Sequence, residues 1–170
     1  MKFLDLAEER YSVRDFSAKP VEEKKLQRIL KAGQAAPTAK NNQPQYIYVL
    51  KDEQVEKAAA ATNCLYGAPV VLIVCYDKEQ VAALPEMNDI DFGYVETSCV
   101  ITHMLLQATA LGLGTCWVGA FYENKLREIF DIPDNLVICG LVDIGYPGEK
   151  GQPSERHKQR KPLEETVEYL

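Results

Sequence analysis

Apolar residues recur along the chain with two spacings, one typical of an amphipathic helix and one typical of a buried strand. Within residues 21–33 they follow Leu26 at i+3, i+4 and i+7, the spacing that places side chains on one face of a helix. This helix is expected to begin at Pro20 and to stop before Pro37. The run 70–76 is apolar without interruption, which indicates a strand covered on both faces.

The longest predicted helix covers residues 91–111. Its apolar positions almost encircle its second half, so we expect burial by its own sheet or by another subunit. His103 lies in this helix and is expected to be an interface or core residue rather than an acid or base. The remaining predicted elements are a first helix ending near residue 10, strands at 46–50, 115–119 and 136–144, and helices at 52–61 and 124–130. Together they predict an α+β domain of four or five strands covered by helices, followed by a mostly extended arm.

A chain of 170 residues with 46% hydrophobic and 26% charged residues fits a single globular domain. Its formal net charge of −6 argues against general nucleic-acid binding, which needs a basic face. The run 70–76 is too short to span a membrane, and the first twelve residues lack the apolar centre of a signal peptide. The five cysteines show no C-x-x-C spacing and join only two histidines, so we expect a cytoplasmic protein without a metal site.

The charges are segregated along the chain. Residues 150–161 carry five Lys/Arg and one Glu, a local net charge of +4, so the other 158 residues sum to −10. Near the start, Arg10 and Arg14 flank Ser12. This clustering indicates one local anion to be bound, with a solvated tail as the alternative.

Three segments combine into a candidate cofactor site, at residues 10–14, 36–44 and 158–162. The guanidinium and ammonium groups of the first and third suit a phosphate. The hydroxyl and amide side chains of the second suit a polyol chain and a ring edge that both donates and accepts hydrogen bonds. The G-L-G run at 112–114 lacks the strand-to-helix context of a dinucleotide fingerprint, and Cys116 is expected to pack rather than react. The combination indicates a phosphorylated aromatic cofactor.

These residues resemble the FMN-dependent nitroreductase family in its small, minimally decorated form. The markers occur in the order and spacing of the family and cover nearly the whole chain. They are RYSVRDF at 10–16, APTAKNNQP at 36–44, ATALGLGTCWVGAF at 108–121, DIGYP at 143–147 and KQRKPLEETV at 158–167. Two departures are Gln45, where the family usually has an aromatic residue, and Thr38, which replaces a more usual serine.

The resemblance implies one domain over residues 1–170, with a mixed, mainly antiparallel central sheet flanked by helices. It also implies an intertwined homodimer with two FMN sites, each at the subunit interface. The helix 91–111 would form the core of that interface, and residues 148–170 would extend as an arm onto the partner subunit. The segment 84–92 is open to two interpretations, a cover over the flavin or a plain connection.

The resemblance further assigns cofactor-binding residues one by one. The phosphate is expected on Arg10, Lys158 and Arg160, and the ribityl chain with the N1/O2 side of the ring on Ser12 and Arg14, next to Tyr11. From the partner subunit come Pro37, Thr38, Ala39 and Asn41, with Gln43 behind them, while Val118, Gly119 and Ala120 pass beside N5. A fixed Arg14 at N1/O2 would stabilise the negatively charged reduced flavin and raise its potential.

The implied activity is that of a flavin-dependent NAD(P)H oxidoreductase in which the flavin carries the chemistry, so no catalytic side chain is expected. NADH or NADPH delivers hydride to FMN, leaves, and is replaced by a small electron-poor acceptor such as a nitroaromatic or a quinone. Two alternatives stay open. The same flavin scaffold can serve reductive dehalogenation or flavin fragmentation, or the protein can be a flavin-binding module without turnover.

Overall fold

The computed structural model describes residues 2–83 and 90–170. Its four strands form one sheet in the order β1-β2-β4-β3, and every neighbouring pair is antiparallel. The segment 84–92, predicted to be a cover or a connection, lies mostly outside the described residues. The expectation of a mainly antiparallel sheet of four or five strands is confirmed. The strands are β1 (Gln45–Lys51), β2 (Val70–Asp77), β3 (Gly114–Val118) and β4 (Leu136–Gly145).

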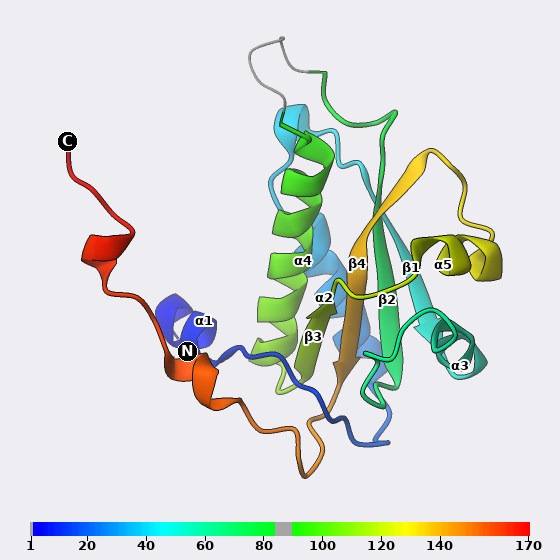
Figure 1. The fold of residues 1–170 in the computed structure, drawn as a ribbon, viewed down its shortest axis with the longest axis horizontal. Helices are drawn as coiled ribbons and strands as arrows, with labels where there is room; N and C mark the ends of the chain where they lie inside the picture. Colours follow the sequence, from blue (N-terminus) through cyan, green and yellow to red (C-terminus); the bar gives the residue numbers. More distant parts are fainter. Residues whose placement is uncertain (1, 84–89) are drawn as a thin grey trace.

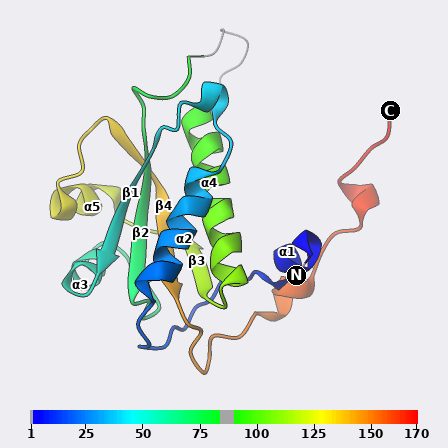
Figure 2. The same ribbon diagram turned by 180° about the vertical axis from the view of Figure 1, so that it is seen from behind.

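Helices cover both faces of this sheet (Figures 1 and 2). α2 and α4 lie side by side on one face, and the shorter α3 and α5 lie on the other. α1 lies beyond the sheet, next to the beginning of the C-terminal arm, in both views. The helices are α1 (Phe3–Glu9), α2 (Glu23–Gln34), α3 (Glu53–Ala58), α4 (Phe92–Ala110) and α5 (Glu123–Phe130).

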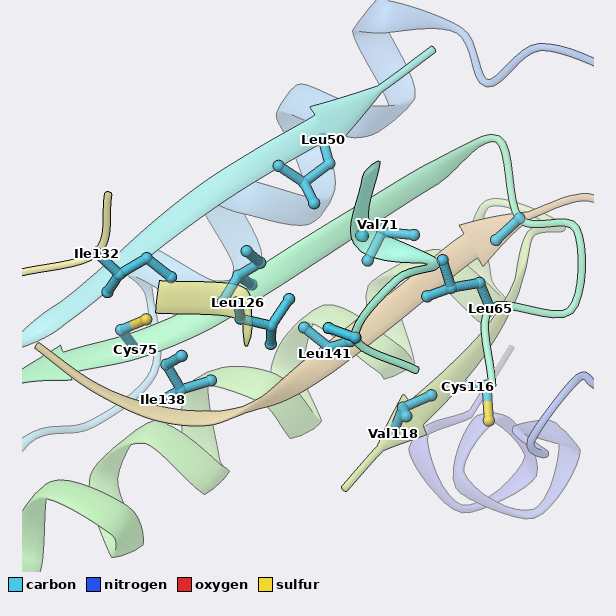
Figure 3. Packing of buried hydrophobic residues seen from close by; sticks show 14 of the residues in the cluster. Leu50, Leu65, Val71, Cys75, Cys116, Val118, Leu126, Ile132, Ile138 and Leu141 are labelled. Carbon is cyan, nitrogen blue, oxygen red and sulfur yellow. The ribbon is translucent and has the colours of Figure 1, made fainter. Parts of the chain in front are cut away.

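β2 is buried on both faces, as its uninterrupted apolar sequence predicts. Because successive strand residues point to opposite faces, its even-numbered residues from Val70 to Val74 join the cluster under α2 and α4. Its odd-numbered residues from Val71 to Cys75 join the cluster on the other face. Figure 3 shows that second cluster, where Leu126 of α5 packs among side chains from β2 and β4. The two clusters make the sheet the rigid centre of the domain.

Two helices begin or end away from their predicted positions. α2 begins at Glu23 rather than at Pro20, because Glu22 keeps an extended backbone and is the N-cap residue. α3 ends at Ala58, three residues early, and residues 59–61 form a turn instead. Proline and apolar spacing mark where a helix is allowed, but the backbone conformation of the flanking residues decides where it ends.

α4 buries one face and exposes the other. Val100 and Met104 are fully buried against α2 and the sheet. On the opposite face, Tyr94 and Val95 are 45% and 47% exposed, and His103 is exposed as well. The expected burial by the sheet therefore applies to one face only. The interpretation of His103 as a core residue is wrong, because the helix turns its side chain outward, while an interface role stays a prediction.

The end of the chain extends away from the sheet as an arm (Figure 1). It contains two short 3₁₀ turns, η2 (Glu155–Lys158) and η3 (Leu163–Glu165), and none of residues 152–170 is buried. This agrees with the expected, mostly extended arm. Within the described ranges, none of the helices has the length and apolar character needed to cross a membrane.

Candidate cofactor-binding site

A cavity of about 600 Å³ opens where the beginning and the end of the chain meet. Residues 154–157 of the arm line it together with five predicted site residues from both chain ends. The structure thus brings the first and third predicted segments into one place. The five predicted residues in its lining are Arg10, Tyr11, Ser12, Arg14 and Arg160.

A short bridge to the sheet positions the first segment. Ser12 forms a parallel bridge with Thr115 of β3, and the Val13 N–H donates to the Thr115 carbonyl at 2.8 Å. The Val13 side chain is fully buried, and it packs so close to Gly114 that a Cβ added there would collide with it. Because Val13 is fixed in the core, the chain on either side of it is held at the cavity, including Arg14.

Two contacts join the arm to this segment. The Tyr11 hydroxyl donates to the Gly151 carbonyl at 2.9 Å. Nε2 of His157 lies 2.8 Å from the Glu8 carbonyl oxygen, and the rings of Tyr11 and His157 are in contact with centroids 5.8 Å apart. The end of α1 and the η2 turn are therefore linked directly, which closes one side of the cavity.

Four arginines line the cavity, namely Arg10, Arg14, Arg156 and Arg160. Among the residues that the structure describes, none of the four forms an ion pair with a carboxylate. Guanidinium groups without carboxylate partners attract anions and match the geometry of phosphate oxygens. The lining therefore fits a phosphate group.

Lys158 lies beside this lining rather than in it. Together with Glu8, His157 and Arg160 it borders an adjoining hollow of about 340 Å³. Sequence reasoning missed Arg156 and His157, which do line the main cavity. Their only signal was their place in the basic run, because the conformation of η2 decides which side chains of that run face the cavity.

The loop at 36–44 lies elsewhere in the same chain. Oε1 of Glu96, near the beginning of α4, accepts the backbone N–H of Ala39 at 2.6 Å. The arginine cavity lies near the other end of α4, because Tyr11, which lines that cavity, also borders a hollow with Thr109. At 1.5 Å per residue, the helix separates Glu96 from Thr109 by about 20 Å. One chain therefore does not bring the loop to its own arginines, and the predicted residues left apart are Pro37, Thr38, Ala39, Asn41 and Gln43.

This loop has an unusual and well-connected backbone. Lys40, Asn41 and Gln43 have φ values of 53°, 57° and 51°, in the left-handed region that few residues other than glycine and asparagine adopt readily. Thr38 stabilises the turn, because its Oγ1 accepts the Gln43 N–H at 3.1 Å. The loop thus presents the hydroxyl and amide groups of Thr38 and Asn41 in a defined arrangement.

The end of β3 provides an open backbone surface. Val118 is buried, whereas Gly119 and Ala120 are exposed. The Ala120 carbonyl accepts the Thr62 hydroxyl at 2.6 Å, which fixes the chain just after the strand. A Cβ added at Gly119 would meet no atom within 4 Å, so space is available beside this backbone for a planar ligand.

Two buried titratable groups face each other across β3 and β4. Cys116 pairs with Asp143 in the strand register, and both side chains are buried. Burial, with Asp143 nearby, raises the pKa of the Cys116 thiol to about 11, so it stays protonated and packs as expected. Burial raises the pKa of Asp143 to about 8. The described residues include no cluster of metal-binding side chains.

Comparison with known proteins adds a consistent set of relatives. The model of the nitroreductase family matches residues 7–65 and 57–146. A nitroreductase family protein from Clostridium difficile has a crystal structure with a TM-score of 0.91 and 39% identity, over 99% of this chain and 98% of that one. A protein from Archaeoglobus fulgidus assigned as an NADH dehydrogenase/NAD(P)H nitroreductase is 30% identical over 83% of each chain. A protein from Desulfovibrio desulfuricans assigned as a nitroreductase, solved in complex with FMN, is 28% identical with a TM-score of 0.79, over 98% of this chain and 95% of that one.

Proposed function

Because the chain belongs to the nitroreductase family, we propose that it is an FMN-dependent NAD(P)H oxidoreductase whose acceptor is a nitroaromatic, a quinone or a related electron-poor molecule. The observation that carries this proposal is the cavity lined by four arginines that have no carboxylate partner in the described ranges. The names of the relatives support FMN as cofactor and NAD(P)H as electron donor.

The residues around the cavity fit the phosphate end of FMN. Arg10 and Arg160 come from opposite ends of the chain and offer guanidinium groups to the same space. Ser12 offers a hydroxyl next to them, which suits the ribityl chain. The lining holds four arginines and one carboxylate, Glu155, so a bound phosphate would compensate the remaining positive charge.

When bound, FMN supplies the redox chemistry, taking hydride from NAD(P)H and passing it to the acceptor in alternation. The chain itself contributes orientation and electrostatics. Arg14 keeps a permanent positive charge at the cavity, which favours a ligand that becomes anionic on reduction. The open backbone at Gly119 leaves room for a flat ring. No side chain of the protein is assigned as acid, base or nucleophile.

We further infer that two copies of the chain complete each site. The outward face of α4 exposes Tyr94 and Val95, and α1 adds Phe3 and Leu4 at 72% and 65% exposure. Exposed apolar residues on two neighbouring helices are typical of an interaction surface. Antiparallel pairing of two α4 helices would carry the Thr38 loop of one copy to the arginine cavity of the other.

Absorbance and size measurements on the pure protein test this proposal. We expect it to bind FMN, to scatter light as a dimer, and to lose its yellow colour when NADH or NADPH is added without oxygen. Adding a nitroaromatic or a quinone should restore the colour. A protein that stays colourless after incubation with FMN would refute the proposal.

A pair of arginine variants tests the phosphate assignment. Arg160→Ala should weaken FMN binding about tenfold or more, because hydrogen bonds to charged groups are lost. Arg28→Ala removes the same charge from the exposed face of α2 and should leave the affinity unchanged. Arg127 is not a suitable control, because it donates to the carbonyls of Pro133 and Leu136 and so supports the fold. Equal losses in the two variants would contradict the assignment.

A further inference from the structure

The two ring nitrogens of His157 have different surroundings. Nε2 lies 2.8 Å from the backbone carbonyl oxygen of Glu8. A carbonyl oxygen only accepts hydrogen bonds, so Nε2 must carry the proton in this contact. In a neutral His157, the single N–H is therefore Nε2–H, which donates to the Glu8 carbonyl, and Nδ1 carries a lone pair.

His157 lines the main cavity together with its four arginines. It borders the main cavity with Arg10 and Arg160, and it also borders the adjoining hollow next to Lys158. The ring is held in place by its contact with Tyr11 and by its bond to α1, so it is a positioned group rather than a freely moving one. Among the described residues Nδ1 has no hydrogen-bond partner, so it is the ring nitrogen left for a ligand.

We propose that His157 is a phosphate-binding residue that takes up a proton when the FMN phosphate binds. The inference rests on the proposed function and deepens it. A phosphate dianion accepts hydrogen bonds and donates none, so Nδ1 can bind it only as Nδ1–H. Since Nε2–H is already used by Glu8, this contact requires the doubly protonated imidazolium. The added proton comes from solvent when the phosphate dianion binds, and from the phosphate itself when the monoanion binds. FMN binding is therefore coupled to pH through this one side chain.

The charged and titratable groups around His157 come from two elements. From α1 and the segment after it come Glu8, Arg10, Tyr11 and Arg14. From the arm come Glu155, Arg156, Lys158 and Arg160. Histidine is the side chain whose charge normally changes between pH 5 and 8, so the proposed coupling is tested across this range.

A substitution that keeps a donor in the place of Nε2 and removes Nδ1 tests the proposal. In His157→Gln, the side-chain amide nitrogen reaches about as far as Nε2 and can still donate to Glu8, but no group replaces Nδ1. FMN and riboflavin affinities are measured from pH 5.5 to pH 8.5 by quenching of flavin fluorescence. Lys24→Gln, at an exposed position of α2, is the matched control. Thermal melting of the FMN-free proteins checks that each variant folds.

We expect His157→Gln to bind FMN about tenfold more weakly than the parent at pH 5.5, and the two proteins to converge toward pH 8.5. Because the titration of the phosphate itself is common to both proteins, the difference between them reports on His157 alone. Riboflavin lacks the phosphate, so its affinity should be equal in the two proteins, and Lys24→Gln should match the parent throughout.

Three results would overturn the inference. The first is an equal FMN affinity of parent and His157→Gln at pH 5.5. The second is a loss of FMN affinity in His157→Gln that does not change with pH, and the third is an equal loss of riboflavin affinity. Either of these two results would indicate a purely structural role of His157. A parent protein that binds neither flavin would instead refute the proposed function, so the two failures are distinguishable.

Discussion

Glu96 holds the backbone of Ala39 from inside the fold. Its Oε1 accepts the Ala39 N–H at 2.6 Å, and the residue is 4% exposed. Oε2 is buried and has no hydrogen-bond partner among the described residues. Leaving a buried side-chain oxygen without a hydrogen bond costs free energy, so Glu96 favours the donors within its reach. This contact ties the loop at 36–44 to α4.

We therefore expect Glu96→Ala to loosen the loop. Without an acceptor, the Ala39 amide should exchange its hydrogen about tenfold faster or more, since the net value of such a bond is about 1.4 kcal/mol or above. FMN affinity should fall with it, because Thr38 and Asn41 lose their fixed arrangement. Glu96→Gln keeps an acceptor at the same place and should restore both values. If Glu96→Ala exchanged and bound FMN like the parent, the loop would not depend on this contact.

Asp143 should make the protein less stable as pH rises. Both carboxylate oxygens are buried without a hydrogen-bond partner in the described part of the chain, and burial raises the pKa to about 8 from 3.8. Between these values the folded chain keeps a proton that the unfolded chain has lost. Stability therefore falls by up to about 1.4 kcal/mol per pH unit from about pH 4 to pH 8.

The measurement is urea unfolding at pH 5, 6.5 and 8. Asp143→Asn cannot ionise, so its unfolding free energy should lack this part of the pH dependence and should exceed that of the parent most clearly at pH 8. Parallel pH profiles for the two proteins would show that Asp143 is already ionised or solvated in the folded state.

Gly119 and Gly140 allow binding and folding effects to be separated. Gly119→Val adds side-chain atoms to open space at a position without positive φ, so the fold should tolerate it while FMN affinity falls severalfold or more. At Gly140, an added Cβ would lie 2.5 Å from Nε1 of Trp117, so Gly140→Ala should lower the melting temperature. Melting curves and FMN titrations on both variants check this contrast. A strongly destabilised Gly119→Val would argue against an open site there.

Removing the arm should affect assembly and cofactor binding but not the fold. A chain ending after Gln152 keeps the Tyr11–Gly151 contact and the bonds from Gly148 and Lys150 to Asp15. It loses Arg156, His157 and Arg160. None of the removed residues is buried. We expect a melting temperature within a few degrees of the FMN-free full chain, no measurable FMN binding, and a smaller mass by light scattering. A yellow dimer without the arm would contradict both roles of this segment.

Most of the fold can be predicted from the sequence, because the spacing of apolar residues depends directly on which side chains are buried. The run 70–76 predicts β2 and the spacing after Leu26 predicts α2. β2 lies within one residue of its predicted bounds, and α2 exists but begins at Glu23 rather than at Pro20. The outward orientation of His103 could not be read in the same way. Its half of α4 is apolar almost all round, so periodicity does not distinguish the face under the sheet from the face left exposed.

The candidate site can be predicted only in part, because its contacts depend on distances in the folded chain. Arg10 and Arg160 could be placed together because their charge suits one ligand. Glu96 gave a weaker signal, the only Asp, Glu, Lys or Arg within α4, and nothing in its spacing identifies Ala39 as the partner. His157 gave none that distinguishes it from its neighbours, because the distinction between its two nitrogens depends on the distance to the Glu8 carbonyl.

The length of helix between Glu96 and Thr109 has a genetic consequence. In the proposed dimer, every flavin site draws its arm from one chain and its loop from the other, so an arm defect and a loop defect each damage both sites when expressed alone. In a mixed dimer of the two variants, both defects fall on one site and the second site is wholly intact. Two inactive proteins would thus produce an active one on mixing, and mutations in this single gene would sort into two complementation groups.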